Sequence, residues 1–142
     1  MVESRFDFDR TEGAGGRLDG LSWGGRRLRA GDMLSSAEVS YLRHVVARQE
    51  WPDGTTIEDY IQSIQEAIRN PKSLMFTSFY DAGVQLGFIA PSGQWRGRYG
   101  GDWIMVEYRV NTGHWVTAYQ FSGPRGTIPR STHRSNVRWQ RR

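Results

Sequence analysis

The sequence predicts an α+β domain with two N-terminal helices packed on one antiparallel sheet of four to five strands. Residues 35–70 repeat apolar side chains at helical spacing, whereas residues 74–121 form short runs of β-branched and aromatic residues separated by turn signals. Helices followed by strands are typical of a fold in which helices cover one face of a sheet. The other face is expected to stay open for a ligand.

The composition limits the classes of protein to consider. A chain of 142 residues has room for one domain, and a hydrophobic fraction of 37% argues against general disorder. The absence of cysteine excludes disulfides, thiolate metal sites and a cysteine nucleophile. Residues 1–25 contain no apolar run long enough for a signal peptide or membrane span, so any export is expected to depend on a larger carrier chain or a dedicated machine. No membrane partner is expected.

The net charge of +4 is unevenly distributed. Residues 1–32 hold six acidic residues and six arginines, residues 33–107 hold nine acidic and six basic residues, and residues 108–142 hold seven arginines and no acidic residue. Concentrated positive charge indicates a polyanionic partner such as RNA or DNA. A solvated basic tail would give the same pattern. Arginine suits bidentate phosphate recognition, although a codon bias would also explain why Lys72 is the sole lysine.

The glycine-rich, charged segment 1–32 lacks periodicity and is expected to be a linker or an irregular arm that packs Trp23 on the body. Residues 33–142 are expected to form the single α+β domain, which ends in a basic tail. No function is assigned to the arm.

The first helix is expected to run from Ser35 to about Gln49. Ser35 and Glu38 have the spacing of a capping box. The predicted buried stripe consists of Val39, Leu42 and Val46. The opposite flank carries Tyr41, His44 and Arg48, and the last two are expected to be neighbours one turn apart.

Thr55 and Glu58 repeat the capping-box spacing at the start of a second, structural helix, which Asn70-Pro71 ends. Its apolar positions are Ile57, Tyr60, Ile61, Ile64, Ala67 and Ile68. Strands are expected over residues 74–80, 84–89, 103–110 and 114–121, with a short final strand around residues 135–139.

The strands 103–110 and 114–121 are expected to form a β-hairpin joined by an Asn-Thr-Gly turn. Successive side chains of a strand point to opposite faces. One face of the second arm is therefore expected to carry Trp115, Thr117, Tyr119 and Phe121. A hydroxyl, a phenol and aromatic rings in one row make this face the expected place of the chemistry.

The glycine-rich loop 91–101 combines cations with aromatic rings in the residues Trp95, Arg96, Arg98 and Tyr99. On a mobile loop this combination suits single-stranded nucleic acid, because cations hold phosphates while rings stack on bases. With Arg48, Trp115 and Arg125, these residues are the predicted RNA contacts. A long hairpin connection is the alternative explanation of the loop.

The segment Trp115-Val116-Thr117-Ala118-Tyr119, with the preceding strand 103–108 and a glycine turn, resembles a motif of small bacterial ribonuclease toxins grouped with barnase, EndoU, RelE and the tRNase colicins. The group includes C-terminal domains of contact-dependent inhibition and other polymorphic toxins. The helix that pairs His44 with Arg48 and the helix end Ala67–Pro71 are also similar, so the resemblance covers residues 35–121.

The resemblance implies metal-independent RNA cleavage by a helix histidine, a basic residue on or near the sheet, and the threonine and tyrosine of the last motif. These roles fall on His44, Thr117 and Tyr119. The basic residue matches least well, because relatives often place it on an earlier strand. Arg98 and Arg109 are the candidates for that role in this chain.

The residues can supply the required chemistry. Cleavage without a metal needs a base for the 2′-hydroxyl, a cation for the charge that develops on the phosphate, and an acid for the 5′-oxygen. A histidine side chain can act as base or acid near neutral pH, which makes His44 the candidate, and Arg48 beside it would favour the neutral form. Thr117 and Tyr119 can donate to phosphate oxygens.

Each residue also has a structural explanation. A histidine on a helix flank is commonly a surface residue, and threonine and tyrosine are ordinary strand residues. His114 faces away from Thr117 and is a fallback partner for His44, while His133 lies in the basic tail. Three scattered histidines predict no metal site, and no cofactor is expected.

The sequence thus predicts a bacterial endoribonuclease toxin that acts in the cytoplasm on tRNA or another RNA, alone or delivered into a target cell as part of a secreted effector. The product would be a 2′,3′-cyclic phosphate. An acidic immunity protein or antitoxin is the expected partner. A non-catalytic RNA-binding or regulatory module and a DNA-binding protein are the alternatives.

Overall fold

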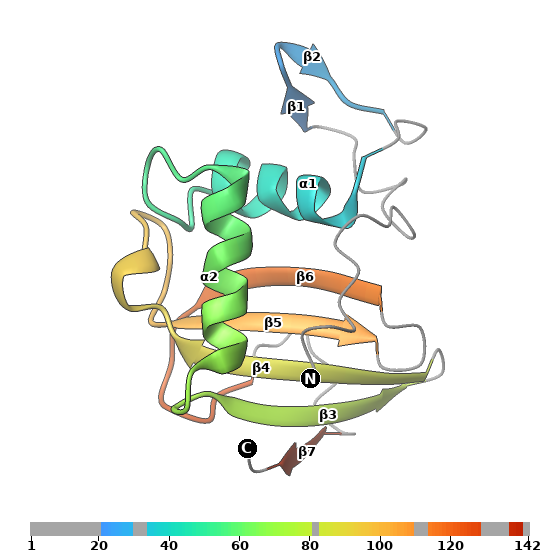
Figure 1. Ribbon diagram of the computed structural model, residues 1–142, viewed down its shortest axis with the longest axis vertical. Helices are drawn as coiled ribbons and strands as arrows, with labels where there is room; N and C mark the ends of the chain where they lie inside the picture. The colour runs from blue at the N-terminus through green and yellow to red at the C-terminus, as the bar shows by residue number, and fades with distance from the viewer. Residues whose placement is uncertain (1–20, 30–33, 81–82, 110–113, 129–136, 141–142) are drawn as a thin grey trace.

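The computed structural model describes residues 21–29, 34–80, 83–109, 114–128 and 137–140 and has an α+β architecture (Figure 1). A short hairpin precedes two helical segments, and an antiparallel sheet follows them. The elements in chain order are β1 (Ser22–Trp23), β2 (Arg26–Arg27), α1 (Ser36–Tyr41), η3 (Leu42–Ala47), α2 (Ile57–Arg69), β3 (Leu74–Tyr80), β4 (Gly83–Pro91), η4 (Gly93–Trp95), β5 (Trp103–Arg109), β6 (His114–Phe121) and β7 (Val137–Gln140).

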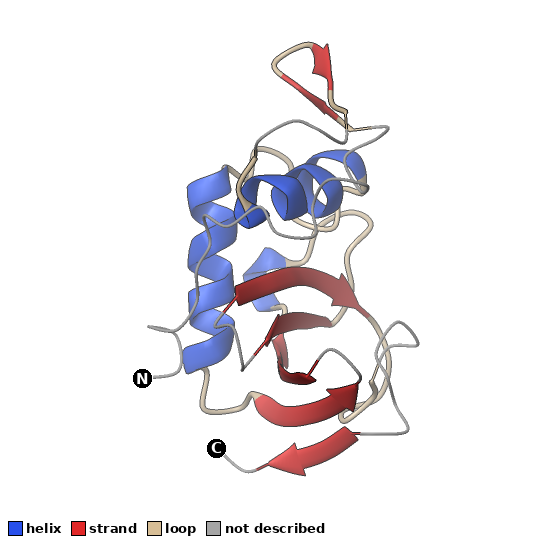
Figure 2. Ribbon diagram, turned by 90° about the vertical axis from the view of Figure 1, so that its right-hand side faces the viewer, coloured by secondary structure: helices blue, strands red, loops and turns tan. Residues whose placement is uncertain are grey.

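The main sheet has the strand order β6-β5-β4-β3-β7, and every pairing in it is antiparallel. The helix α2 crosses one face of the sheet, whereas α1 lies beside its β6 edge (Figures 1 and 2). The predicted α+β class is confirmed, but a β-hairpin precedes the helices, and of the described helices only α2 covers a face of the sheet, because α1 lies at the sheet edge. The four long strands lie close to their predicted ranges. Val110, the hairpin turn and residues 135–136 lie outside the described part.

The β1–β2 hairpin lies within the segment that was expected to be irregular. Leu21 and Leu28 flank its two strands, and both are buried with Val39 and Leu42 of the first helix. Trp23 makes an edge contact with Tyr41, with 6.2 Å between the ring centroids. The expected packing of Trp23 on the body is therefore found.

The first helix begins with the predicted capping box of Ser35 and Glu38 and changes geometry halfway. From Leu42 to Ala47 it is a π-helix, in which the amide of Arg48 bonds to the carbonyl of Arg43. A π-helical turn holds more residues than an α-helical turn, so the buried face is displaced along the sequence. The predicted stripe fails at Val46, which is 49% exposed, and His44 is 5% exposed instead of lying on the outer flank.

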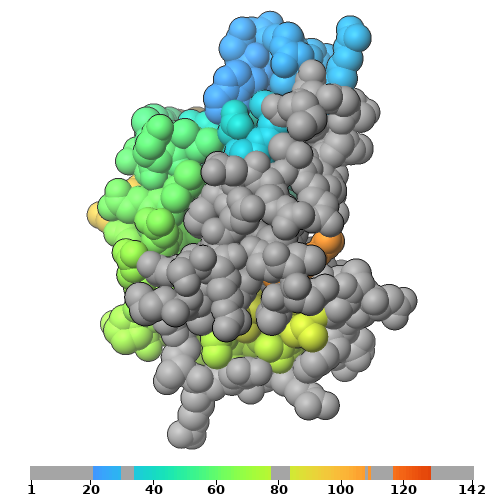
Figure 3. All heavy atoms as spheres, turned by 45° about the vertical axis from the view of Figure 1, so that its right-hand side comes forward, coloured from blue at the N-terminus to red at the C-terminus, as the bar shows by residue number. Residues whose placement is uncertain are grey.

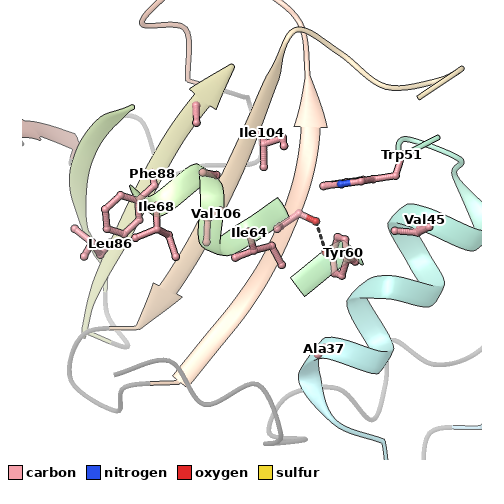
Figure 4. Packing of buried hydrophobic residues seen from close by; sticks show 13 residues of the cluster. Ala37, Val45, Trp51, Tyr60, Ile64, Ile68, Leu86, Phe88, Ile104 and Val106 are labelled. Carbon is pink, nitrogen blue, oxygen red and sulfur yellow. Dashed lines mark hydrogen bonds between the residues drawn. The ribbon is translucent and has the colours of Figure 1, made fainter. Parts of the chain in front are cut away.

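The second helix, α2, begins one residue later than predicted. Its capping box uses Thr56 and Asp59, not Thr55 and Glu58, because Thr55 is held in the preceding turn by its bond to the carbonyl of Pro52. The predicted apolar face packs on the sheet, where α2 residues such as Ile64 and Ile68 meet Phe88 and Val106 (Figure 4). Among the described residues no helix is long and apolar enough to cross a membrane.

The sheet face opposite α2 was expected to be open, but its centre is buried. Phe76, Ile89 and Met105 are 0–2% exposed and form a second apolar cluster. The partly buried side chains that pack against this cluster are Leu74, Trp103, Tyr119 and Phe121.

A register shift interrupts the pairing of β5 with β6. Glu107 is opposite Thr117, whereas Tyr108 is opposite Trp115, so one additional residue, Val116, is inserted on β6. The strict alternation that grouped Trp115 with Thr117 does not hold across this irregularity. The side chain of Trp115 lies outside the described part of the structure.

Candidate functional site

The candidate site lies where the first helix meets the β6 edge of the sheet. An edge strand presents backbone groups that no neighbouring strand satisfies. Here the amide of Gln120 donates to Oε1 of Glu50 at 2.7 Å, and the carbonyl of Ala118 accepts from the Tyr60 hydroxyl at 2.6 Å. The helical side of the molecule thus supplies side chains to the outer edge of β6.

Three hydroxyl groups form a directed chain at this edge. Tyr60 uses its single proton for the Ala118 carbonyl, so Ser40 must donate to the Tyr60 oxygen over 2.7 Å. The hydroxyl of Ser40 has no second proton to donate, so the Thr117 hydroxyl 2.9 Å away must donate to Ser40. The proton of Thr117 is therefore directed to the protein interior, and the threonine offers a ligand only an acceptor.

Burial raises the pKa of Tyr60 far above its ordinary value of 10.0. The hydrogen bond from Ser40 acts in the opposite direction, and the negative charge of Glu50 adds to the increase. Tyr60 is accordingly a neutral hydrogen-bonding residue in the core and not an acid for catalysis near neutral pH.

His44 bonds to a carboxylate. Its Nδ1 atom lies 2.8 Å from Oε2 of Glu50, and both residues are buried, at 5% and 7% exposure. A carboxylate accepts protons, so Nδ1 carries the hydrogen in either charge state of the imidazole. In the neutral ring Nε2 is then the proton acceptor, and no described residue hydrogen-bonds to it.

The structure also brings His44 to Tyr119. The two rings stack with 5.7 Å between their centroids and 29° between their planes. The Tyr119 hydroxyl is 3.4 Å from Oε1 of Glu107, which is too long for a strong O–H···O bond. Glu107 lies opposite Thr117 in the sheet register and is 8% exposed. Helix and sheet thus place an imidazole, a phenol and two carboxylates in one region.

The expected neighbour of His44, Arg48, has an exposed side chain, whereas His44 is buried. The charged group that hydrogen-bonds to the imidazole is the carboxylate of Glu50, opposite in sign to the guanidinium that the sequence predicted.

The loop 91–101, which was expected to be mobile, is hydrogen-bonded to the body of the molecule. The amides of Gly97 and Tyr99 donate to the carbonyls of Glu50 and Gln49. A Cβ atom on Gly97 would overlap the Trp51 and Glu50 backbone, so only glycine allows this approach. Arg98 is thereby held beside the segment that supplies Glu50.

The aromatic and basic residues of this loop have different surroundings. Trp95 is partly buried against the core, and its indole donates to Glu66 at 2.9 Å. Arg96 pairs with Asp102 at 2.6 Å on the surface. Tyr99 is 65% exposed, and Arg98 is exposed without an ion-pair partner among the described residues.

The remaining predicted cations are Arg109 and Arg125. Arg109 follows Glu107 by two residues on β5, so both belong to the same face of that strand. Its Nε atom is buried and has no hydrogen-bond partner within the described segments. Arg125 is exposed in the loop after β6.

Sequence reasoning missed Ser40, Glu50, Tyr60 and Glu107. Glu50 directly follows the first helix and precedes Trp51, and an acidic residue at that position is typical of an exposed helix end. Its pairing with His44 depends on a reversal of the chain between the π-helix and residue 50. In this turn Gln49 has a positive φ of 53°, and the amide of Glu50 donates to the carbonyl of His44. Glu107 could have been found from the sequence, because it is the single acidic residue in the otherwise largely apolar strand Trp103–Arg109.

No group of three or more histidine, aspartate or glutamate side chains suited to a metal ion occurs among the described residues. No family model, curated protein or solved structure matches the chain. The chemistry at the β6 edge must therefore be argued from its own geometry.

Proposed function

We propose that this protein is a metal-independent endoribonuclease that cleaves tRNA or another RNA by transesterification to a 2′,3′-cyclic phosphate. The observation that carries the proposal is the arrangement around His44, whose ring stacks on Tyr119 while its Nδ1 atom bonds to Glu50. This arrangement leaves Nε2 as the acceptor in the neutral ring, as a base for the 2′-hydroxyl requires.

The other roles follow from the surrounding groups. Nε2 of His44 takes the proton of the 2′-hydroxyl, and Glu50 stabilises the imidazolium that forms. The imidazolium then gives this proton to the 5′-oxygen as the bond between phosphorus and that oxygen breaks. Tyr119 donates to a phosphate oxygen, and Arg98 or Arg109 pairs with the phosphate charge. Thr117 has a smaller role than the sequence suggested, because its proton is committed to Ser40. It contributes by fixing β6 to the helix.

The biological setting remains part of the proposal. A nuclease of this kind suits a bacterial toxin that acts in the cytoplasm of its producer or of a target cell. Its protecting partner would be an acidic immunity protein or antitoxin that binds the arginine-rich segment 108–142, which holds seven arginines and no acidic residue.

The decisive test is incubation of the protein with total RNA in EDTA. Discrete fragments with 2′,3′-cyclic phosphate ends are expected from the parent. His44→Ala and Tyr119→Phe should reduce cleavage, whereas Gln62→Ala on the exposed side of α2 should leave it unchanged. Equal cleavage by the parent, His44→Ala and Tyr119→Phe would show that the proposed site is wrong.

A second candidate function is a non-catalytic RNA-binding module. The observation that favours it is the burial of His44 and Glu50, whose pairing also holds the Gln120 amide and so has a sufficient structural role. In the same assay this function gives intact RNA that is retarded on a native gel.

A further inference from the structure

A second concave site lies on the other side of the first helix from the β6 edge. A pocket of about 520 Å³ opens between the β1–β2 hairpin, the π-helix and the segment 52–58. Its volume falls in the range of small-molecule sites. The hairpin stands at one end of the molecule next to α1, as the space-filling view shows (Figure 3).

The described residues of the lining combine apolar surface with two carboxylates and include no cation. Its apolar members include Trp23, Tyr41 and Val46, and its charged members are Asp53 and Glu58. Trp23 and Val46 are two of the three large hydrophobic residues exposed in the described part of the chain. Large exposed apolar side chains that gather at one pocket commonly mark a binding site.

The two aromatic residues are held in place by the fold. Tyr41 donates its hydroxyl to the Thr55 carbonyl at 2.7 Å, and its ring meets Trp23 at 62° between the planes. The hairpin that carries Trp23 is anchored by Leu21 and Leu28, which are buried against the first helix. The rings thus form a preformed aromatic corner.

Carboxylates act electrostatically on this corner. The pKa of the Tyr41 hydroxyl is raised by burial and, in addition, by the charges of Glu58 and Asp59. The two charged side chains in the lining, Asp53 and Glu58, are opposite in sign to the net charge of +4 for the whole chain. Arg26 lies opposite Trp23 in the hairpin, so a bound cation is favoured on the side of the pocket formed by the segment 52–58.

We propose that the pocket binds an organic cation of the alkylammonium class. Its positive charge lies against the rings of Trp23 and Tyr41 and faces the carboxylates of Asp53 and Glu58, while its apolar substituents contact Val46. Aromatic rings attract alkylammonium ions through their negative faces, and nearby carboxylates add to the attraction. This site is independent of the proposed ribonuclease chemistry.

The test uses choline and its neutral isostere 3,3-dimethylbutan-1-ol, which differ in one atom and one charge. Both are titrated into the full chain while the backbone amide resonances are followed by NMR. Choline is expected to shift the amides of Gly54, Thr55 and Thr56 and to bind at least about fivefold more tightly than the alcohol.

Variants connect the binding to the pocket. The double variant Asp53→Asn/Glu58→Gln should weaken choline binding about two- to tenfold without changing binding of the alcohol. Trp23→Leu should abolish the preference for choline, and thermal unfolding checks that each variant is folded. Asp102→Asn removes an exposed carboxylate elsewhere and should bind like the parent.

Three outcomes would overturn the inference. Equal binding of choline and the alcohol would show an apolar pocket without selection for charge. Absence of choline binding at tens of millimolar, or resonance shifts that map away from residues 54–56, would exclude the site. Unchanged choline binding by the folded double variant would do the same.

Discussion

The carboxylate of Glu50 joins His44 to the edge of the sheet. Its Oε2 atom lies 2.8 Å from Nδ1 of His44, and its Oε1 atom accepts the Gln120 amide at 2.7 Å. Gln120 follows Tyr119, whose ring stacks on His44. One side chain therefore fixes the imidazole relative to the strand that carries its stacking partner, so a change at position 50 affects both chemistry and stability.

Glu50→Gln should reverse the hydrogen-bond polarity at His44. The new amide oxygen can still accept from Gln120, while the new amide nitrogen donates to Nδ1, which moves the ring hydrogen to Nε2 and removes the base. We expect RNA cleavage to fall by about 100-fold or more, with a stability loss of about 1 kcal/mol. Single-turnover cleavage and ¹⁵N NMR of the imidazole measure the two effects. Glu66→Gln, at a carboxylate that also accepts from a ring N–H, is the matched control.

Glu50→Ala should destabilise the fold much more. It leaves the buried amide of Gln120 and Nδ1 of His44 without their acceptor. We expect the free energy of unfolding to fall by about 2–4 kcal/mol, measured by urea denaturation. A loss no larger than that of Glu66→Ala, whose carboxylate is less buried, would contradict the structural role of the pair.

Ser40→Ala should disconnect the hydroxyl chain. The serine accepts from Thr117 and donates to Tyr60, and all three groups are partly or fully buried. The expected cost is about 1–3 kcal/mol of unfolding free energy. Ser122→Ala removes an exposed hydroxyl that accepts the Asp102 amide at 3.3 Å, and it should cost about 0.5 kcal/mol or less. Similar losses of unfolding free energy for the two variants would contradict the proposed chain of hydrogen-bonded hydroxyl groups.

Tyr60 should make the stability depend on pH in alkali. Its pKa is raised above 10.0 in the folded state, chiefly by burial. Above pH 10 the unfolded state loses this proton while the native state keeps it, so stability falls as the pH rises; below that range the contribution is constant. Between pH 9 and 11 the parent should lose about 1–1.5 kcal/mol more than Tyr60→Phe. Urea titrations at the two pH values measure the difference, and identical losses would refute it.

Gly97→Ala should loosen the loop 91–101. The added methyl group would overlap the Glu50 and Trp51 backbone, at an expected cost of about 1–3 kcal/mol. Gly93, in the same loop, has a φ of +53° and open space around its Cα, so Gly93→Ala should cost about 1–2 kcal/mol through backbone strain alone. Only the Gly97 change should also increase hydrogen exchange at the amides of Gly97 and Tyr99.

The regular parts of the fold could be predicted because their signals are local. The Ser35–Glu38 capping box, the apolar face of α2 and the alternation in β3 to β6 each depend on residues a few positions apart. The predicted start of α2 was wrong by one residue, because Thr55 and Thr56 are both followed three positions later by an acidic residue that could complete a capping box. The competing bond of Thr55 to Pro52 decided the outcome.

The site was predicted less completely because its geometry depends on two irregularities. The π-helix turned His44 inward, whereas Arg48 is exposed as expected, and the inserted residue Val116 interrupts the pairing with β5 on which the predicted alternation depended. Neither has a clear signal in the sequence. The expected proximity of His44 to Tyr119 is nevertheless found, whereas Glu50 could not be paired with His44 without the chain reversal at Gln49.

The side chains that occupy the outer edge of β6 also restrict how this molecule can associate with others. An exposed strand edge can recruit a strand from a second chain, which leads to extended sheets and aggregation. At Ala118 and Gln120 that edge is closed by Tyr60, Ser40 and Glu50. A variant that opens it, such as Glu50→Ala, exposes a template for intermolecular sheet growth in addition to losing stability, so precipitation on storage should accompany its lower resistance to urea.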